Sequence, residues 1–114
     1  MSAISVCHWR NQRISAVVLI PLTLWFVISM FVHMGDSRAQ IAAWLSRPVE
    51  GLLMAALVLC VLYHMVLGVR VVIEDYVADD GRRARAITAV TVAGFALAVV
   101  ALAALAEIGF GAEP

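Results

Sequence analysis

A single histidine inside a long apolar stretch is the first residue whose type and position could do chemistry. His64 stands within the run CVLYHMVLG, residues 60–68. A neutral imidazole binds haem iron well, because one ring nitrogen can hold the metal while the other donates a hydrogen bond. An ionisable side chain in such a stretch is costly and therefore indicates a functional site. From this residue alone, a haem ligand and a histidine that only hydrogen-bonds a neighbouring helix have equal support.

A second polar group, Glu74-Asp75-Tyr76, follows His64 by about 18 Å if the segment is helical. A tyrosine hydroxyl can donate to a carbonyl oxygen, and an adjacent carboxylate can orient groups or relay protons. A quinone headgroup is bound by groups of this kind. Arg70, one turn before Glu74, either pairs with it or extends toward the membrane surface. The sequence assigns no role to Arg70, Glu74 or His33.

Three stretches without charge, each long enough to cross a membrane, must position these residues: 14–32, 51–69 and 86–106. As helices they would be about 29 to 32 Å long, which matches a hydrocarbon core of about 30 Å. We therefore predict an all-α integral membrane protein. It would be a single three-helix domain over residues 1–114, with spans at about 14–34, 50–73 and 86–107. Pro21 is expected to kink the first helix.

Composition excludes several other classes of protein. The 114 residues are 64% apolar and 14% charged, whereas soluble domains are roughly 45–50% apolar and about 25% charged. Eight acids balance eight arginines, and there is no lysine, so no electrostatic footprint for nucleic acid is present. Cys7 and Cys60 form neither a disulfide framework nor a CxxC redox motif. Soluble DNA-binding proteins and free hydrolases are thereby excluded.

The distribution of arginine predicts the orientation in the membrane. Six arginines lie in the N-terminal segment or in the loop between the second and third spans, whereas two lie in the loop after the first span. The positive-inside rule places the N-terminus and the second loop in the cytoplasm, with the C-terminus outside. Residues 41–45 are expected to lie along the outer interface, with Trp44 in an aromatic belt. Small residues of the third span, among them Gly94, would let another helix come close.

The histidines cannot all serve one metal. His64 falls near the middle of the bilayer, whereas His33 closes the first span at its outer end and His8 precedes that span. If His64 binds haem through two axial histidines, the second must therefore come from another chain. The protein would then supply half of a haem-binding site.

The pattern His64-x3-Gly68-x6-Asp75-Tyr76, together with Arg13-Ile14-Ser15-Ala16 at the start of the first span, resembles the small hydrophobic membrane anchor of succinate dehydrogenase, the respiratory complex II. The resemblance covers roughly residues 10–77, and the third span agrees in position and length only. It implies that this chain is half of a two-subunit membrane anchor bundle.

The resemblance also implies roles for individual residues. The histidine matching His64 is an axial ligand of a b-type haem, and the arginine matching Arg13 lies near the haem propionates. The tyrosine matching Tyr76 bonds a ubiquinone oxygen, and the aspartate matching Asp75 belongs to the same site. No catalytic residue for succinate oxidation is implied on this chain.

Partners and location follow from the same resemblance. A flavoprotein subunit would oxidise succinate, an iron–sulfur subunit would carry electrons, and a second membrane anchor subunit would supply the other haem ligand. Membrane lipid would surround the anchor. We expect a bacterial inner membrane, since the N-terminus has no transit-like composition.

Two alternatives stand beside this interpretation. The first is the anchor of a fumarate reductase, an enzyme that catalyses the same reaction in the reverse direction. The second is a cofactor-free structural membrane protein of three helices, in which His64 is merely packed and Asp75-Tyr76 is interfacial. A coloured complex containing flavin would exclude the second.

Overall fold

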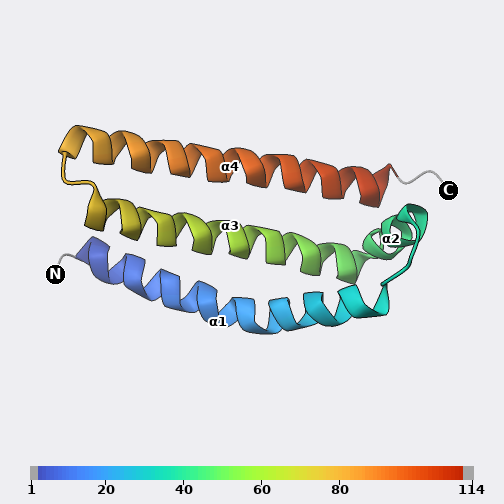
Figure 1. The fold of residues 1–114 in the computed structure, drawn as a ribbon. Coiled ribbons are helices and arrows are strands. Elements are labelled where there is room, and N and C mark those ends of the chain that lie inside the picture. Colours follow the sequence, from blue (N-terminus) through green and yellow to red (C-terminus); the bar gives the residue numbers. More distant parts are fainter. Residues whose placement is uncertain (1–2, 112–114) are drawn as a thin grey trace.

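The computed structural model describes residues 3–111 of the chain, and that part is entirely helical apart from short connections. Its elements are α1 (Ala3–Val32), α2 (Arg38–Leu45), α3 (Pro48–Tyr76) and α4 (Asp80–Phe110) (Figure 1). Three of them, α1, α3 and α4, are long and apolar enough to cross a membrane. The predicted fold class, all-α with three membrane-spanning helices, is confirmed.

The helices extend well beyond the apolar spans predicted from the sequence. α3 has 29 residues and α4 has 31, so each is about 43 to 47 Å long. This length is close to the thickness of a whole bilayer with its headgroup regions, about 40–45 Å. Hydropathy detects only the hydrocarbon-crossing part, because polar residues at the membrane surface can continue a helix without changing its backbone hydrogen bonds.

The helix α3 is the centre of the arrangement. It packs against α1 on one flank and against α4 on another, whereas α1 and α4 do not contact each other in the described range. Figure 1 shows α3 lying between the two other long helices, with the short α2 at the end opposite the N-terminus. Pro21 lies inside α1, which continues through it as a curved helix (Figure 1).

This packing buries little of the chain. Among the described residues, the buried apolar side chains are Leu22, Trp44, Leu57 and Leu67, each still 6–9% exposed, and large apolar side chains are exposed along all three long helices. In water such a surface would aggregate, but in a bilayer it is covered by acyl chains or by other helices. The environment must therefore be a membrane, with room for partner helices.

Gly94 sets the close approach of α4 to α3. It is buried, and a Cβ built on it would lie 2.5 Å from Cγ2 of Val66 on α3. Only a residue without a side chain fits there. For Gly94, this confirms the expectation that a small residue of the third span lets another helix come close.

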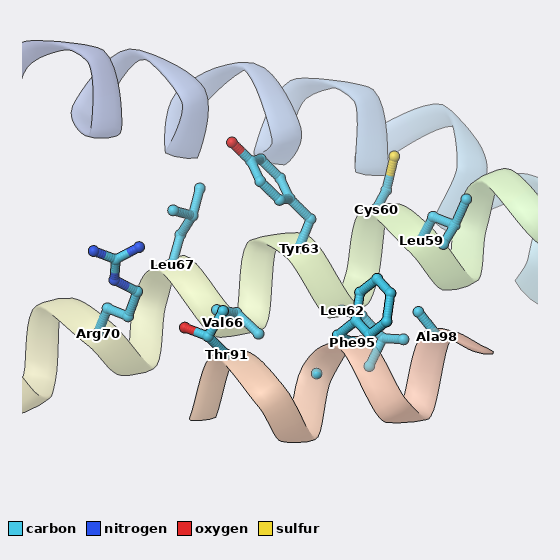
Figure 2. Close-up of a pocket in the computed structure, with 11 residues that line it drawn as sticks. Leu59, Cys60, Leu62, Tyr63, Val66, Leu67, Arg70, Thr91, Phe95 and Ala98 are labelled. Atoms are coloured by element: carbon cyan, nitrogen blue, oxygen red, sulfur yellow. The ribbon is translucent and has the colours of Figure 1, made fainter. Parts of the chain in front are cut away.

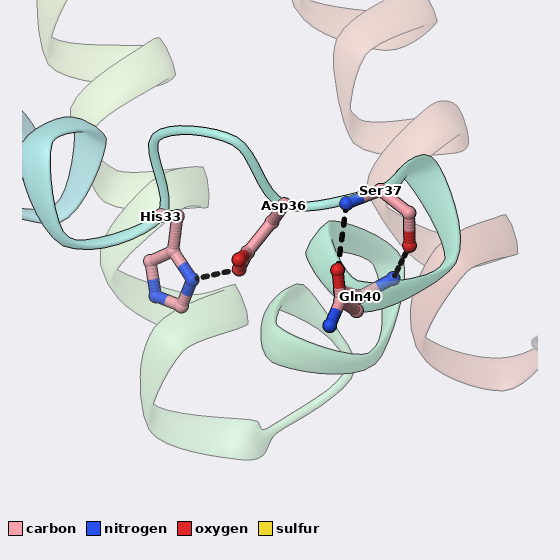
Figure 3. A network of polar contacts seen from close by, with 4 residues as sticks. All are labelled: His33, Asp36, Ser37 and Gln40. Atoms are coloured by element: carbon pink, nitrogen blue, oxygen red, sulfur yellow. Dashed lines mark hydrogen bonds and ion pairs between the residues drawn. The ribbon is translucent and has the colours of Figure 1, made fainter.

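The end of the molecule that carries α2 is held by local polar contacts. Gly35 has a φ of +92°, which reverses the chain after α1. Ser37 then caps α2 through a capping box with Gln40, and His33 Nδ1 lies 2.7 Å from Oδ2 of Asp36 (Figure 3). These contacts fix the path of the first loop.

Trp44 of α2 packs against aromatic rings of the same chain. It is 6% exposed, its ring centroid is 5.9 Å from that of Trp25, and the ring of His33 lies 4.3 Å away. The indole therefore contacts these rings instead of facing lipid. Its placement in an aromatic belt at the outer interface stays a prediction.

Candidate functional site

The polar centre of the molecule is a contact between α1 and α3. Ser15 on α1 is 6% exposed, and its Oγ lies 2.9 Å from Nδ1 of His64 on α3. The same Oγ donates to the backbone carbonyl of Gln12, also at 2.9 Å. The histidine is therefore not isolated among apolar side chains. One of its nitrogens is held by the neighbouring helix.

The other ring nitrogen of His64 is free to bind something else. Among the described residues, none forms a hydrogen bond with Nε2, and the side chain is half-buried rather than enclosed. The imidazole thus has one nitrogen held within the chain and one nitrogen available. This is the arrangement that a metal-binding histidine requires, with its second nitrogen bonded to a neighbouring group.

Gly68, one turn after His64, faces the same helix. A Cβ built on it would lie 3.4 Å from Nε2 of Gln12, an ordinary van der Waals contact, so the Gln12 amide packs beside Gly68. The Oε1 of Gln12 is buried and has no hydrogen-bond partner among the described residues. An unpaired buried acceptor costs about 1–3 kcal/mol. A donor from a partner chain or from water would remove that cost.

The part of the chain that the structure describes contains no cluster that could hold a metal ion by itself. No group of three or more histidines, cysteines, aspartates or glutamates comes together there. His33 is bonded to Asp36 and lies 18 residues beyond Ser15, about 27 Å along the direction of α1. A single imidazole suits a metal whose other ligands come from elsewhere, as in haem, where the porphyrin supplies four.

Arg13 lies two residues before Ser15 and is exposed. Its guanidinium carbon is 5.0 Å from the ring centroid of Trp9, a cation–π contact on the same helix. None of the described carboxylates forms an ion pair with it. Arg13 is thus held in the first half of α1, ten residues after its start, with its hydrogen-bond donors available to an anion.

Asp75 and Tyr76 lie at the end of α3, adjacent to the short connection to α4. Both are exposed, Tyr76 at 83%, and neither side chain bonds another described residue. The structure therefore does not bring them together with His64. The sequence separation of 12 residues, about 18 Å along α3, is preserved. Any pocket around Tyr76 needs walls from outside this chain.

A groove of about 570 Å³ runs between α3 and α4, and Figure 2 shows the side chains that line it. It is apolar except near Arg70, Tyr63 and Thr91, and His64 is not among its lining residues. Arg70 does not pair with Glu74; the ion pairs in the described range are His33–Asp36 and Asp80–Arg83. Of the two roles considered for Arg70, pairing with Glu74 is wrong, because the side chain lines this groove instead.

Ser15 is the site residue to which sequence reasoning assigned no role. It stands in the motif at the start of the first span, but a serine in an apolar helix ordinarily bonds its own backbone, which Ser15 also does. The available signal was the coincidence of two polar residues, Ser15 and His64, in neighbouring spans. The predicted uncharged stretches place Ser15 one residue from the inner end of the first span and His64 five residues from that of the second, so predicted depth did not bring the two together.

Comparison with known proteins gives a consistent family. The model of the family described as "Succinate dehydrogenase/Fumarate reductase transmembrane subunit" matches residues 2–103. A succinate dehydrogenase hydrophobic membrane anchor subunit of Paracoccus denitrificans is 36% identical over 92% of this chain and 80% of its own length. The protein of the same description from Rickettsia bellii is 35% identical over 81% of this chain and 78% of its own. No solved structure matches significantly.

Proposed function

Since this chain belongs to the succinate dehydrogenase/fumarate reductase transmembrane subunit family, we propose that it is a membrane anchor subunit of a succinate:quinone oxidoreductase. In this role it contributes one axial ligand of a b-type haem and part of a quinone site. Succinate oxidation takes place on partner chains. The similar proteins are described as succinate dehydrogenase subunits, which favours succinate oxidation over fumarate reduction as the physiological direction.

The observation that carries the haem proposal is the state of His64. Its Nδ1 is held by Ser15 and its Nε2 has no partner in the described part of the chain. The residues therefore fit an axial ligand: one neutral nitrogen is presented, and its ring is oriented by a hydrogen bond from the other side. When bound, haem supplies a one-electron redox centre within the membrane. The second axial histidine comes from the other anchor subunit.

Arg13 is proposed to bind a haem propionate. Its guanidinium can donate two parallel hydrogen bonds to a carboxylate, and the stacking on Trp9 limits its motion without using those donors. Arg13 lies two residues from Ser15, which touches His64, so the cation and the imidazole share one region of the α1–α3 pair. A purely structural anchoring role would leave haem binding unchanged when the residue is altered.

Tyr76 and Asp75 are proposed to contribute to the quinone site. The phenol of Tyr76 donates a hydrogen bond to a quinone carbonyl, where negative charge develops as electrons arrive. Asp75 orients the site or passes a proton to the reduced oxygen. Their exposure supports this role only in an assembled complex, in which the iron–sulfur subunit and the second anchor subunit would complete the pocket.

The proposed location is a bacterial inner membrane, with ubiquinone as substrate. The N-terminus and the α3–α4 connection would face the cytoplasm, and the C-terminus the periplasm. This orientation puts Asp75 and Tyr76 at the cytoplasmic surface, on the same side as the soluble flavoprotein and iron–sulfur subunits. Electrons would then enter the quinone site without crossing the bilayer first.

The test is purification of the complex from cells that carry an affinity tag on this chain. The wild-type complex should contain flavin and a b-type haem, with both soluble subunits and a second anchor present. In His64→Leu we expect the b-type absorption to be lost or altered in the reduced-minus-oxidised spectrum. Met65→Leu, an adjacent exposed position on the same helix, is the matched control and should keep it.

Two outcomes would contradict the proposal. A wild-type preparation without colour and without soluble partners would favour the cofactor-free structural protein. A coloured complex in which His64→Leu leaves the haem spectrum identical would keep the anchor role but remove His64 as the ligand.

A further inference from the structure

The hydroxyl group of Ser15 makes two contacts of equal length, and together they decide where the proton of His64 lies. Ser15 Oγ is 2.9 Å from the carbonyl oxygen of Gln12 and 2.9 Å from Nδ1 of His64. A hydroxyl has one proton to donate and lone pairs with which to accept. A carbonyl oxygen can only accept. Both contacts can be hydrogen bonds at the same time only when the proton of Ser15 is directed to Gln12.

With that proton used, the contact between Ser15 and His64 needs a proton from the ring. Nδ1 must carry the hydrogen and donate it to Oγ. A neutral imidazole has only one N–H group, so Nε2 is then left with a bare lone pair. We infer that Ser15 is a positioning residue that holds His64 as the Nδ1–H tautomer and presents Nε2 as the nitrogen that binds metal.

The opposite tautomer would be penalised in this setting. If Nε2 carried the hydrogen, that N–H would find no acceptor among the described residues. The contact between Nδ1 and Ser15 Oγ would then hold no proton, because the hydroxyl hydrogen is used at Gln12, and two lone pairs would face each other at 2.9 Å. The position of Ser15 and the lack of an acceptor for an Nε2–H group among the described residues thus act in the same direction.

The burial of Ser15 limits the motion of its hydroxyl group and so maintains the hydrogen bond with His64. The serine is 6% exposed and is fixed to its own helix through Gln12, so its lone pair points toward α3 in a set direction. The α1–α3 packing therefore orients the ring before any ligand arrives. Loss of an outer hydrogen-bond partner of a metal-binding histidine typically costs about 10- to 100-fold in metal affinity or activity.

This inference rests on the proposed haem role for its consequence, but the tautomer is a property of the chain itself. The first experiment therefore uses the full chain in lipid nanodiscs with ¹⁵N-labelled histidine and a neutral ring. Nitrogen chemical shifts distinguish a protonated from an unprotonated ring nitrogen. His8→Gln and His33→Gln assign the signals. Wild-type His64 should show protonated Nδ1 and unprotonated Nε2.

Three variants give the comparison. Ser15→Ala should produce a mixture of tautomers, because the acceptor is gone. Ser15→Thr keeps a hydroxyl at the same position and should retain the Nδ1–H form. Ser29→Ala removes another serine of α1 that is buried and should have no effect. A wild-type His64 with its hydrogen on Nε2, or a tautomer unchanged in Ser15→Ala, would overturn the inference.

The second experiment uses the complete complex and measures haem content, the haem midpoint potential and the low-spin electron paramagnetic resonance signal. Ser15→Ala should lower haem retention by about 10- to 100-fold in affinity and shift the signal, whereas Ser15→Thr and Ser29→Ala should resemble wild type. If His64→Leu removes the haem but Ser15→Ala changes none of these readouts, the positioning role fails and the proposed function stands. If the wild-type complex holds no haem, the proposed haem role fails, whatever the tautomer.

Discussion

At the scale of single residues, the central finding is that the intramembrane histidine has a partner. A buried polar group without a partner is costly, and Ser15 removes that cost at Nδ1 of His64 while leaving Nε2 unpaired. Gln12 also has an atom without a hydrogen-bond partner, since its buried Oε1 accepts no hydrogen bond in the described range. Both unpaired atoms lie where α1 meets α3.

Tyr76 gives the first prediction at this scale. Tyr76→Phe removes only a hydroxyl from an exposed ring, so assembly and the haem spectrum should be unchanged. Quinone reduction should fall on the order of 10²-fold, the size expected for the loss of one hydrogen-bond donor to a developing oxyanion. The measurement is steady-state quinone reduction by the purified complex with succinate as donor.

The matched control for this change is Tyr63→Phe. Tyr63 is a tyrosine of the same helix that lines the groove between α3 and α4, away from the end where Tyr76 lies. This variant should keep the wild-type rate. Equal rates for Tyr76→Phe and wild type would exclude Tyr76 from the quinone site.

At the scale of elements, the molecule depends on two helix contacts of different character. The α1–α3 contact contains polar groups, whereas the α3–α4 contact depends on close apolar packing at Gly94. Helix association within lipid has no hydrophobic driving force, so close packing and interhelical hydrogen bonds must supply it. Each contact uses one of these two sources.

Gly94 gives the prediction at this scale. A methyl group at position 94 would lie 2.5 Å from Cγ2 of Val66, whose branched side chain has little rotamer freedom. Gly94→Ala should therefore lower the free energy of unfolding by about 1–3 kcal/mol. Val66→Ala removes the obstructing methyl groups, so the same glycine change should cost much less in that background. Reversible unfolding in mixed micelles, followed by circular dichroism, measures both.

A control for added volume is Ala96→Val, at an exposed position of the same helix, which should have little effect. Equal costs of Gly94→Ala with and without Val66→Ala would show that the contact with Val66 does not determine the stability of this helix pair.

At the scale of the whole molecule, the most informative property is how few apolar side chains the fold buries. The helices α1 and α4 each pack against a different flank of α3, and most large apolar side chains face outward. The predicted quinone residues are exposed, and the candidate haem ligand has one nitrogen without a partner in the described range. These features fit a subunit of a larger membrane complex, as the family match indicates.

Orientation in the bilayer gives the whole-molecule prediction. In a chain with Cys7→Ser and Cys60→Ser, a single cysteine is introduced by Ala39→Cys in α2 or by Ala78→Cys in the α3–α4 connection; both positions are exposed. A membrane-impermeant maleimide on intact spheroplasts should label position 39. Position 78 should react only after permeabilisation, because the arginine distribution places it inside. The reverse labelling pattern would show that the proposed orientation is wrong.

The sequence by itself determined the elements and the family. Uninterrupted apolar length predicts three membrane helices, since hydropathy and helix rise are local quantities that need no knowledge of packing. The spacing of His64, Gly68, Asp75 and Tyr76 resembles a known membrane anchor, and the comparisons confirm that family. The close approach allowed by Gly94 was also predictable, because only a small residue permits it.

Only the tertiary structure decided which side chains meet. Three contacts depend on the rotation of each helix about its own axis. Ser15 contacts His64, and Trp44 packs against Trp25. Arg70 lines a groove instead of pairing with Glu74. Hydropathy is nearly uniform around these helices, so it cannot fix that rotation. It is set by the fit of one helix surface against the next, which involves residues far apart in the chain.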